Sequence, residues 1–269
     1  MRTKSAIVLV ITLCISFQSF SQTDNSNETK PRDSLQVTAE KFKLSGWVEM
    51  NYHRHYLWRG AVWGSNDVSQ PELHFDLGKF WIAGYTNLNL RPKNLSLESY
   101  KQKAVFDEQD VEAGYHNQVG EFEYEAAVAG YFYFNQLETP NTAEATINLK
   151  YPVWKDTKVF TETSVDIGSY RGAFYTGAGL DYEKEIKSLV IEAKVYGGTA
   201  NNKFNNVYYG VNAAKVDFIG GSLNLQYSLP NNLYVALNGE YNRYIDNEVK
   251  AITGLRKSDN FSAHFGITF

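Results

Sequence analysis

The fold is indicated most clearly by nine residues, Phe261-Ser262-Ala263-His264-Phe265-Gly266-Ile267-Thr268-Phe269. Apolar side chains in this stretch alternate strictly with small or polar ones. Successive side chains of a β-strand point to opposite faces of the sheet, so one face of the segment is apolar and the other is polar. The stretch therefore predicts a β-strand that separates two different environments.

The same period of two recurs from residue 44 onward, clearly at 145–151, 189–196 and 223–229. Two stretches, 122–134 and 233–244, alternate over more than ten residues each. That length fits a membrane-crossing strand of about 9–11 residues better than the strand of about 5–6 residues typical of a soluble sandwich. We therefore expect an all-β fold, a transmembrane antiparallel up-and-down β-barrel. A soluble β-sandwich is the alternative.

The alternating segments number about twelve, with ten or fourteen as alternatives. They are expected to begin near Leu44, Pro71, Phe80, Gln109, Glu121, Thr142, Lys158, Ala173, Leu189, Gly221, Leu233 and Phe261. The connections alternate between short turns and long loops, as in bacterial barrels whose two chain ends both lie on the periplasmic side. Residues 206–213 are ambiguous, because they could be an extended part of a loop or part of a strand.

The amino end has the three parts of a secretion signal: positive charge at Arg2 and Lys4, an apolar segment at 6–15, and small residues before Gln22. We expect export, cleavage near Ser21 and residence in the outer membrane of a Gram-negative bacterium. The expected organisation is a signal peptide at 1–21, a polar periplasmic segment at 22–43 and a barrel at 44–269. The single cysteine, Cys14, lies in the leader, which leaves no thiol for a disulfide or a metal site.

Composition excludes several classes of protein. The chain contains 43% hydrophobic and 15% aromatic residues, which is enough apolar material to argue against disorder. A helical membrane bundle would need repeated runs of about 20 apolar residues, and the sequence lacks them. The net charge of −4 does not fit the basic surface of a nucleic-acid-binding protein.

Two short stretches resemble known families of barrels. Tyr56-Leu57-Trp58-Arg59-Gly60, followed by Ser69-Gln70-Pro71-Glu72-Leu73, resembles the opening of the TorF-type porin family. Tyr208-Tyr209-Gly210-Val211 with Ala213-Ala214, together with the ending from Tyr227 to Phe269, is similar to MltA-interacting/OmpV-like outer-membrane barrels. Both resemblances imply an outer-membrane barrel with a pore or scaffold role and carry no catalytic residues. Phe269 is similar to the terminal signal that the barrel insertion machinery reads.

In such a barrel, the polar face of each strand lines the lumen. The residues expected to line a pore are Glu49, His53, Arg59, Glu112, Glu125, Asp166, Glu192, Lys194 and Glu240. Because acidic residues outnumber basic ones on this face, the lumen is expected to favour cations. The alternative is that the charges form pairs that fill a narrow barrel. The hypothesis is a weakly cation-preferring porin for passive diffusion of small solutes, and the alternative is a non-conducting scaffold or binding barrel that interacts with periplasmic cell-wall enzymes.

Loop residues suggest further contacts. Tyr208 and Tyr209 could narrow the pore from the long loop at 200–220. Five tryptophans are expected in the aromatic girdles of the membrane interfaces: Trp47, Trp58, Trp63, Trp81 and Trp154. Lysines of the loop at 91–107 could contact lipopolysaccharide phosphates: Lys93, Lys101 and Lys103. The expected partners are outer-membrane lipid and lipopolysaccharide, the insertion machinery through Phe269, and small solutes, without nucleic acid.

Two pairs of side chains, each on one face of a predicted strand, resemble parts of enzyme active sites. His53 and His55 could begin a metal site, but no third ligand is evident nearby. Ser262 and His264 resemble a nucleophile and its base, yet alternation points both inward and no orienting acid can be identified. The sequence also lacks a G-x-S-x-G elbow. We therefore expect no catalysis, no metal and no cofactor.

Overall fold

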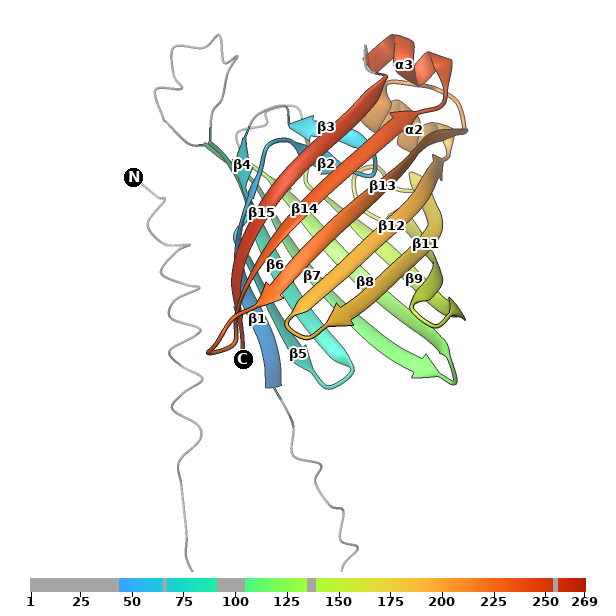
Figure 1. Ribbon diagram of the computed structural model, residues 1–269. Helices are drawn as coiled ribbons and strands as arrows, with labels where there is room; N and C mark the ends of the chain where they lie inside the picture. The colour runs from blue at the N-terminus through green and yellow to red at the C-terminus, as the bar shows by residue number, and fades with distance from the viewer. Residues whose placement is uncertain (1–43, 65–66, 91–104, 135–138, 254–255) are drawn as a thin grey trace, which may run out of the picture. The chain divides into compact units, whose positions relative to one another are not determined.

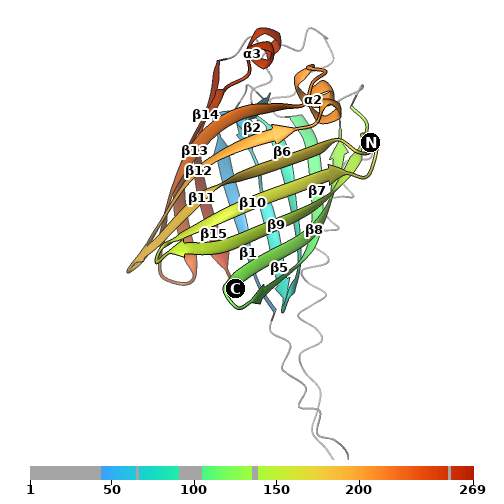
Figure 2. The same ribbon diagram turned by 90° about the vertical axis from the view of Figure 1, so that its right-hand side faces the viewer.

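The computed structural model describes residues 44–64, 67–90, 105–134, 139–253 and 256–269. Its main sheet is antiparallel and closes on itself, because the last strand pairs with the first. Its strands are β1 (Leu44–His53), β4 (Val68–Ser69), β5 (Glu72–Leu77), β6 (Phe80–Asn89), β7 (Val105–Val119), β8 (Phe122–Tyr133), β9 (Thr142–Trp154), β10 (Thr157–Asp166), β11 (Phe174–Ile186), β12 (Leu189–Ala200), β13 (Lys215–Ser228), β14 (Leu233–Tyr244) and β15 (Lys257–Thr268). Figures 1 and 2 show the barrel from two sides.

The barrel has twelve crossings. Strands β4 and β5 both pair with β1 and with β6, so together they form one crossing, interrupted at Gln70-Pro71. A proline in a strand removes one donor from the ladder, which is consistent with the interruption. The predicted number of twelve is therefore confirmed, and the alternatives of ten and fourteen are wrong. The expected leader and polar segment, as well as the three loop lysines, lie outside the described residues.

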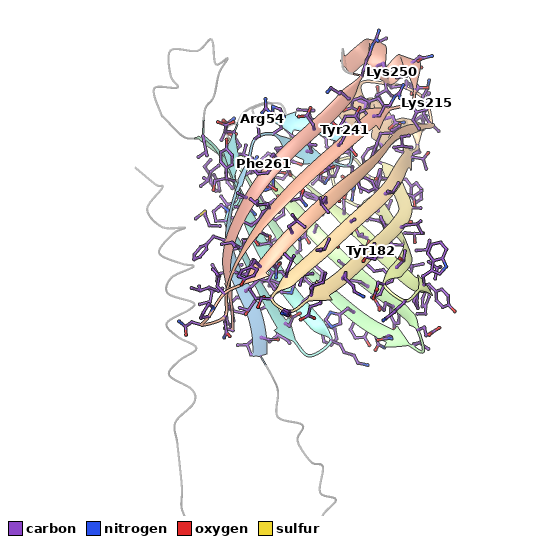
Figure 3. The ribbon with its side chains drawn as sticks, in the orientation of Figure 1. Arg54, Tyr182, Lys215, Tyr241, Lys250 and Phe261 are labelled. Carbon is purple, nitrogen blue, oxygen red and sulfur yellow. The ribbon has the colours of Figure 1, made fainter. Side chains whose placement is uncertain are left out.

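The two faces of the wall differ as the alternation predicts. Side chains on the outer face are large, apolar and uncovered by other parts of the barrel; Val195, for example, is 70% exposed. Figure 3 shows Tyr182, Tyr241 and Phe261 projecting from the outside of the barrel. A sandwich would bury this apolar face against a second sheet. The sandwich alternative is therefore wrong.

The two ends of the barrel also differ. At one end, called the turn end, neighbouring strands are joined by short turns such as Asn231-Asn232, where both residues have positive φ, a conformation that asparagine tolerates. Both ends of the barrel wall meet there, since the amide of Gly46 donates to the carbonyl of Phe269 at 3.1 Å. The opposite end, called the loop end, carries the longer connections.

Two helices lie at the loop end, α2 (Asn202–Tyr209) and α3 (Asn247–Thr253) (Figure 1). Helix α2 begins where the side chain of Asn201 accepts from the amide of Phe204, and it ends at Gly210 in the left-handed conformation. Both expectations are thus wrong for 206–209, because these two caps stabilise a helix there, whereas 210–213 form neither helix nor strand. Strand β13 begins at Lys215, earlier than the expected Gly221. Within the described ranges, no helix is long and apolar enough to cross a membrane.

Candidate functional site

A second, two-stranded sheet lies inside the barrel, formed by β2 (Tyr56–Trp58) and β3 (Ala61–Gly64). The tip of this hairpin is Arg59-Gly60, and both residues have positive φ, 47° and 80°. A Cβ atom on Gly60 would lie 2.5 Å from the ring of Phe218. Only glycine therefore allows the tip to sit this close to the wall.

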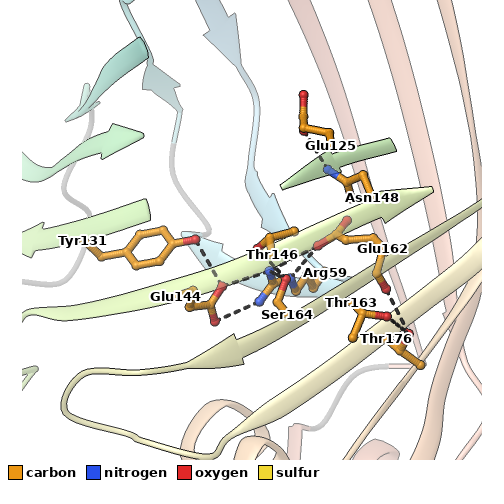
Figure 4. A network of polar contacts seen from close by, with 10 residues as sticks. All are labelled: Arg59, Glu125, Tyr131, Glu144, Thr146, Asn148, Glu162, Thr163, Ser164 and Thr176. Carbon is orange, nitrogen blue, oxygen red and sulfur yellow. Dashed lines mark hydrogen bonds and ion pairs between the residues drawn. The ribbon is translucent and has the colours of Figure 1, made fainter. Parts of the chain in front are cut away.

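The side chain of Arg59 attaches the tip to one side of the wall. Its guanidinium contacts both oxygens of Glu144, on β9, at 2.9 and 3.0 Å (Figure 4). Its Nε donates to Glu162 at 3.1 Å and its Nη2 donates to Ser164 at 2.6 Å, both on β10. Burial alone would lower the pKa of Arg59, but Glu144 and Glu162 raise it above its ordinary value. The guanidinium is therefore charged and held by a fork-shaped contact.

The main chain of the tip is held from the other side of the lumen. The hydroxyls of Tyr244 and Ser258, on β14 and β15, donate to the carbonyl of Gly60 at 2.7 and 3.1 Å. The hydroxyl of Tyr209, on α2, donates to the carbonyl of Arg59 at 2.8 Å. Since β9 and β10 hold the side chain while β14 and β15 hold the backbone, the hairpin crosses the lumen.

Aromatic rings surround the guanidinium. Its central carbon lies 4.4 Å from the ring centre of Trp58, 4.8 Å from that of Tyr175 and 5.9 Å from that of Phe204. The ring of Tyr208 meets Trp58 edge-on at 5.0 Å. Such contacts between a cation and ring faces are favourable, more so where water is excluded. Strands β2 and β3 together with helix α2 thus form one packed body inside the loop end, called the plug.

The fit of Gly60 gives a first prediction. Gly60→Ala should displace the hairpin, because the new Cβ meets Phe218 and alanine in the left-handed region costs about 1–2 kcal/mol. Limited trypsin digestion followed by mass spectrometry should then detect cleavage after Arg59 at least tenfold faster than in the unchanged protein. Gly239→Ala is the control, because no atom lies within 4 Å of its added Cβ. Equal cleavage in both variants would contradict the role of Gly60.

A cavity of about 730 Å³ lies inside the barrel toward the turn end and is called the vestibule. Among the described residues that line it, the charged or titratable ones are Lys79, His116, Glu123, Glu125, Lys150, Glu162 and Lys194. Lys158 also pairs with Glu123 at 2.8 Å, and Lys150 pairs with Asp181 at 3.1 Å. The charges are thus balanced in this half of the lumen.

The uncompensated acidic charge lies beside the plug. Glu108, Asp110 and Glu112 follow one another on the inner face of β7 and are called the acidic row. Glu108 is 2% exposed and Asp110 is fully buried. Tyr56 and Tyr133 contact the carboxyl of Glu108, and Tyr85 contacts that of Asp110. Among the described residues, Oε2 of Glu108 has no hydrogen-bond partner, and no lysine or arginine pairs with either carboxylate. Glu108 is not among the residues predicted to line the pore, although the i, i+2, i+4 spacing of the row indicates a shared face.

Comparison with known proteins agrees with this architecture. No protein family and no curated protein matches the sequence. A solved KdgM porin is 10% identical, with a TM-score of 0.51 over 84% of this chain and 99% of that chain. An outer membrane channel from Pseudomonas putida F1 is 8% identical, with a TM-score of 0.53 over 89% of this chain and 100% of that chain. The chain shares the closed antiparallel β-barrel fold of these two channels. At such low identity the likeness extends to the fold alone.

The porin fold places the remaining predicted residues in different surroundings. Glu192 and Lys194 contact each other at 2.7 Å on β12. Glu125 accepts from Asn148 at 2.9 Å, and Glu240 accepts from Tyr196 at 2.8 Å. These side chains stiffen the inner wall as well as lining it.

Asp166 has a structural role at the loop end. Its carboxylate accepts from the hydroxyl of Thr142 at 2.5 Å and from the amides of Gly168 and Tyr170 at 2.9 and 3.0 Å. It therefore fixes the connection between β10 and β11. Arg59, which was assigned to the wall by alternation, lies on the hairpin instead.

The tryptophans are not all in girdles. Trp47 and Trp81 stack on either side of His74, at ring-centre distances of 3.7 and 5.4 Å, and Trp81 is buried. Trp58 belongs to the plug. The girdle expectation is wrong for these three, because Trp47 and Trp81 fall on the inner phase of their strands and Trp58 is on the hairpin. Trp154 is 68% exposed near the turn end, as a girdle residue would be.

Ser262 and His264 do have an acidic neighbour. Closure of the sheet between β1 and β15 brings Glu49 within 2.7 Å of Nδ1 of His264, whose Nε2 lies 2.8 Å from the hydroxyl of Ser262. This acid could not be identified from the sequence, since only the pairing of the first and last strands places Glu49 there. Ser262 is 1% exposed and lies within a regular strand, without the exposed turn that presents a nucleophile.

The histidine pair expected near the first loop does not become a metal site. Nδ1 of His53 lies 3.0 Å from the amide nitrogen of Asn260, and Nδ1 of His55 lies 2.8 Å from the carbonyl of Asp259. Each ring is therefore bonded to β15. In the part of the chain that the structure describes, no group of three or more His, Cys, Asp or Glu side chains is arranged to hold a metal ion.

Proposed function

We propose that this chain is an outer-membrane channel for passive diffusion of small solutes, narrowed at its loop end by the plug. The observation that carries the proposal is the hairpin tip, held by β9 and β10 on one side and by β14 and β15 on the other, inside a barrel with the porin fold. An apolar outer face and a polar inner face support residence in a membrane. The vestibule of about 730 Å³ gives small polar solutes room below the constriction.

The proposal includes an orientation. In single-chain bacterial barrels the short turns face the periplasm, so the vestibule faces the periplasm and the plug faces the outside. Phe269, half exposed on the outer face at the turn end, is available there to the insertion machinery. In this proposal, Tyr208 and Tyr209 narrow the passage as parts of α2, where the ring of Tyr208 contacts Trp58 of the plug.

The proposal also includes a preference for cations. The vestibule is balanced in charge, whereas the acidic row next to the plug is not neutralised by described lysines or arginines. Charge in the narrowest part of a pore acts most strongly on a passing ion, because little water screens it there. The selectivity is therefore attributed to the acidic row rather than to the lumen as a whole.

Planar lipid bilayers test the channel. The purified full-length protein should insert and produce discrete conductance steps, smaller than those of a twelve-stranded barrel without a plug. A salt gradient across the bilayer should give a zero-current potential of the sign expected for cation preference. Insertion without any steps, in this protein and in plug variants alike, would contradict a channel.

The plug also supports a second candidate, a non-conducting barrel that binds periplasmic cell-wall enzymes at its turn end. The tip is bonded on both sides of the lumen, which is what a permanently closed barrel requires. The two candidates differ in one measurement: a scaffold stays silent in bilayers even when the attachment of Arg59 is removed, whereas a narrowed channel opens further.

A further inference from the structure

A small cavity lies where the plug meets the acidic row. Six residues line it: Tyr56, Trp58, Glu108, Tyr131, Tyr133 and Tyr208. The lining thus consists of five aromatic side chains and one carboxylate. The cavity has room for about one group of the size of a water molecule.

Among the described residues that line the cavity, Glu108 is the only acid, and no described lysine or arginine pairs with it. The residue is 2% exposed, and its Oε2 has no hydrogen-bond partner. Asp110, the next residue on the same face of β7, is fully buried beside Tyr85, and no described lysine or arginine pairs with it. Burying a carboxylate without a cation is costly even where Tyr56 and Tyr133 donate to it, so the arrangement favours a bound positive group.

The rings favour the same kind of group. Aromatic faces attract cations, and cages of Trp and Tyr with an acid are suited to ammonium groups. The plug already contains one such contact, because the guanidinium of Arg59 lies 4.4 Å from the ring centre of Trp58. The charge of Arg59 is matched by Glu144 and Glu162, so it does not neutralise the acidic row.

We infer that this cavity binds the primary ammonium group of a small solute, with Glu108 as its counter-ion and the five aromatic side chains as its cage. A primary ammonium group is about the size of the space and offers three donors to the free carboxylate oxygen. A metal ion fits less well, since no described group of three ligating side chains could hold one. The inference rests on the proposed channel function and specifies which class of cation binds at the constriction.

Calorimetric titration of the detergent-solubilised, full-length protein with methylammonium chloride tests the site at constant ionic strength. The unchanged protein should bind methylammonium, and Glu108→Gln should raise the dissociation constant at least tenfold. Glu192→Gln is the control, because Glu192 already contacts Lys194 at 2.7 Å and lies outside the cavity lining and outside the acidic row. It should change the dissociation constant less than twofold. Tetramethylammonium, which has no N–H donors and exceeds the space, should not compete.

Failure to bind methylammonium, or equal binding by Glu108→Gln, would overturn the inference, as would potassium binding as tightly as methylammonium. Heat-dependent mobility on a denaturing gel reports whether each variant is a folded barrel. If Glu108→Gln does not fold, Tyr133→Leu removes one wall of the cage and should weaken binding at least threefold. Bilayer recordings of the same preparations separate the ammonium site from the channel function. Conductance steps without methylammonium binding would overturn the site alone, and methylammonium binding without conductance steps would overturn the channel alone.

Discussion

Replacing Arg59 with alanine is expected to raise the single-channel conductance severalfold. The substitution removes the fork-shaped contact with Glu144 and the bonds to Glu162 and Ser164. It leaves Glu144, whose side chain is 1% exposed, as a buried charge without its cation, which costs about 3–5 kcal/mol. Water that enters to solvate Glu144 then separates the hairpin from β9 and β10, and the constriction widens.

The backbone contacts of the tip oppose this release. Tyr209, Tyr244 and Ser258 donate to its carbonyls, and each such bond contributes about 1 kcal/mol. The three bonds together contribute about 3 kcal/mol, which is at or below the cost of leaving the carboxylate of Glu144 unpaired. Release of the hairpin from β9 and β10 is therefore favoured.

Bilayer recordings of Arg59→Ala, Arg59→Lys and the unchanged protein provide the measurement. Arg59→Lys keeps the positive charge but loses the fork, so its conductance should lie between the other two. Identical conductance in all three folded proteins would show that Arg59 does not hold the constriction.

Neutralising the acidic row is expected to abolish most of the cation preference. In the triple variant Glu108→Gln, Asp110→Asn and Glu112→Gln, three carboxylates disappear from the wall beside the plug. One carboxylate about 8 Å from a passing ion contributes about 2 kcal/mol at an effective dielectric constant of about 20. The ratio of cation to anion permeability should therefore fall by about an order of magnitude or more.

Zero-current potentials in a potassium chloride gradient measure that ratio. Glu192→Gln is the comparison, because Glu192 already contacts Lys194 at 2.7 Å in the charge-balanced half of the lumen. Its potential should remain close to that of the unchanged protein. A shift in Glu192→Gln as large as that of the triple variant would assign selectivity to the whole lumen instead of the acidic row.

The strands could be predicted because a membrane imposes a period of two on each of them. In 233–241 and 261–269, the outward phase read from the sequence is largely the exposed phase of the barrel. The same reasoning failed for Arg59, since a hairpin that folds into the lumen shows the same alternation as a strand of the wall. It failed for Trp47 and Trp81 for a different reason: a residue type typical of girdles was given more weight than the phase of its strand.

Helix α2 has local signals in the sequence at both of its ends. Asn201 is a favoured helix N-cap and Gly210 a favoured C-cap, and they flank the segment that was read as extended. The contact between Glu49 and His264 had no such local signal. It joins residues at opposite ends of the barrel sequence, which meet only when β1 pairs with β15.

The sequence by itself determined the all-β class, the number of crossings and which side chains face outward. Each strand has hydrocarbon on one side and a polar interior on the other, so its own alternation of apolar and polar residues shows which face is which. The tertiary structure alone decided that 56–64 turns inward, that Arg59 meets Glu144, and that Glu108 is left without a cation. Those facts depend on which strands face each other across the closed barrel, and side-chain alternation along one strand carries no information about the residues opposite it.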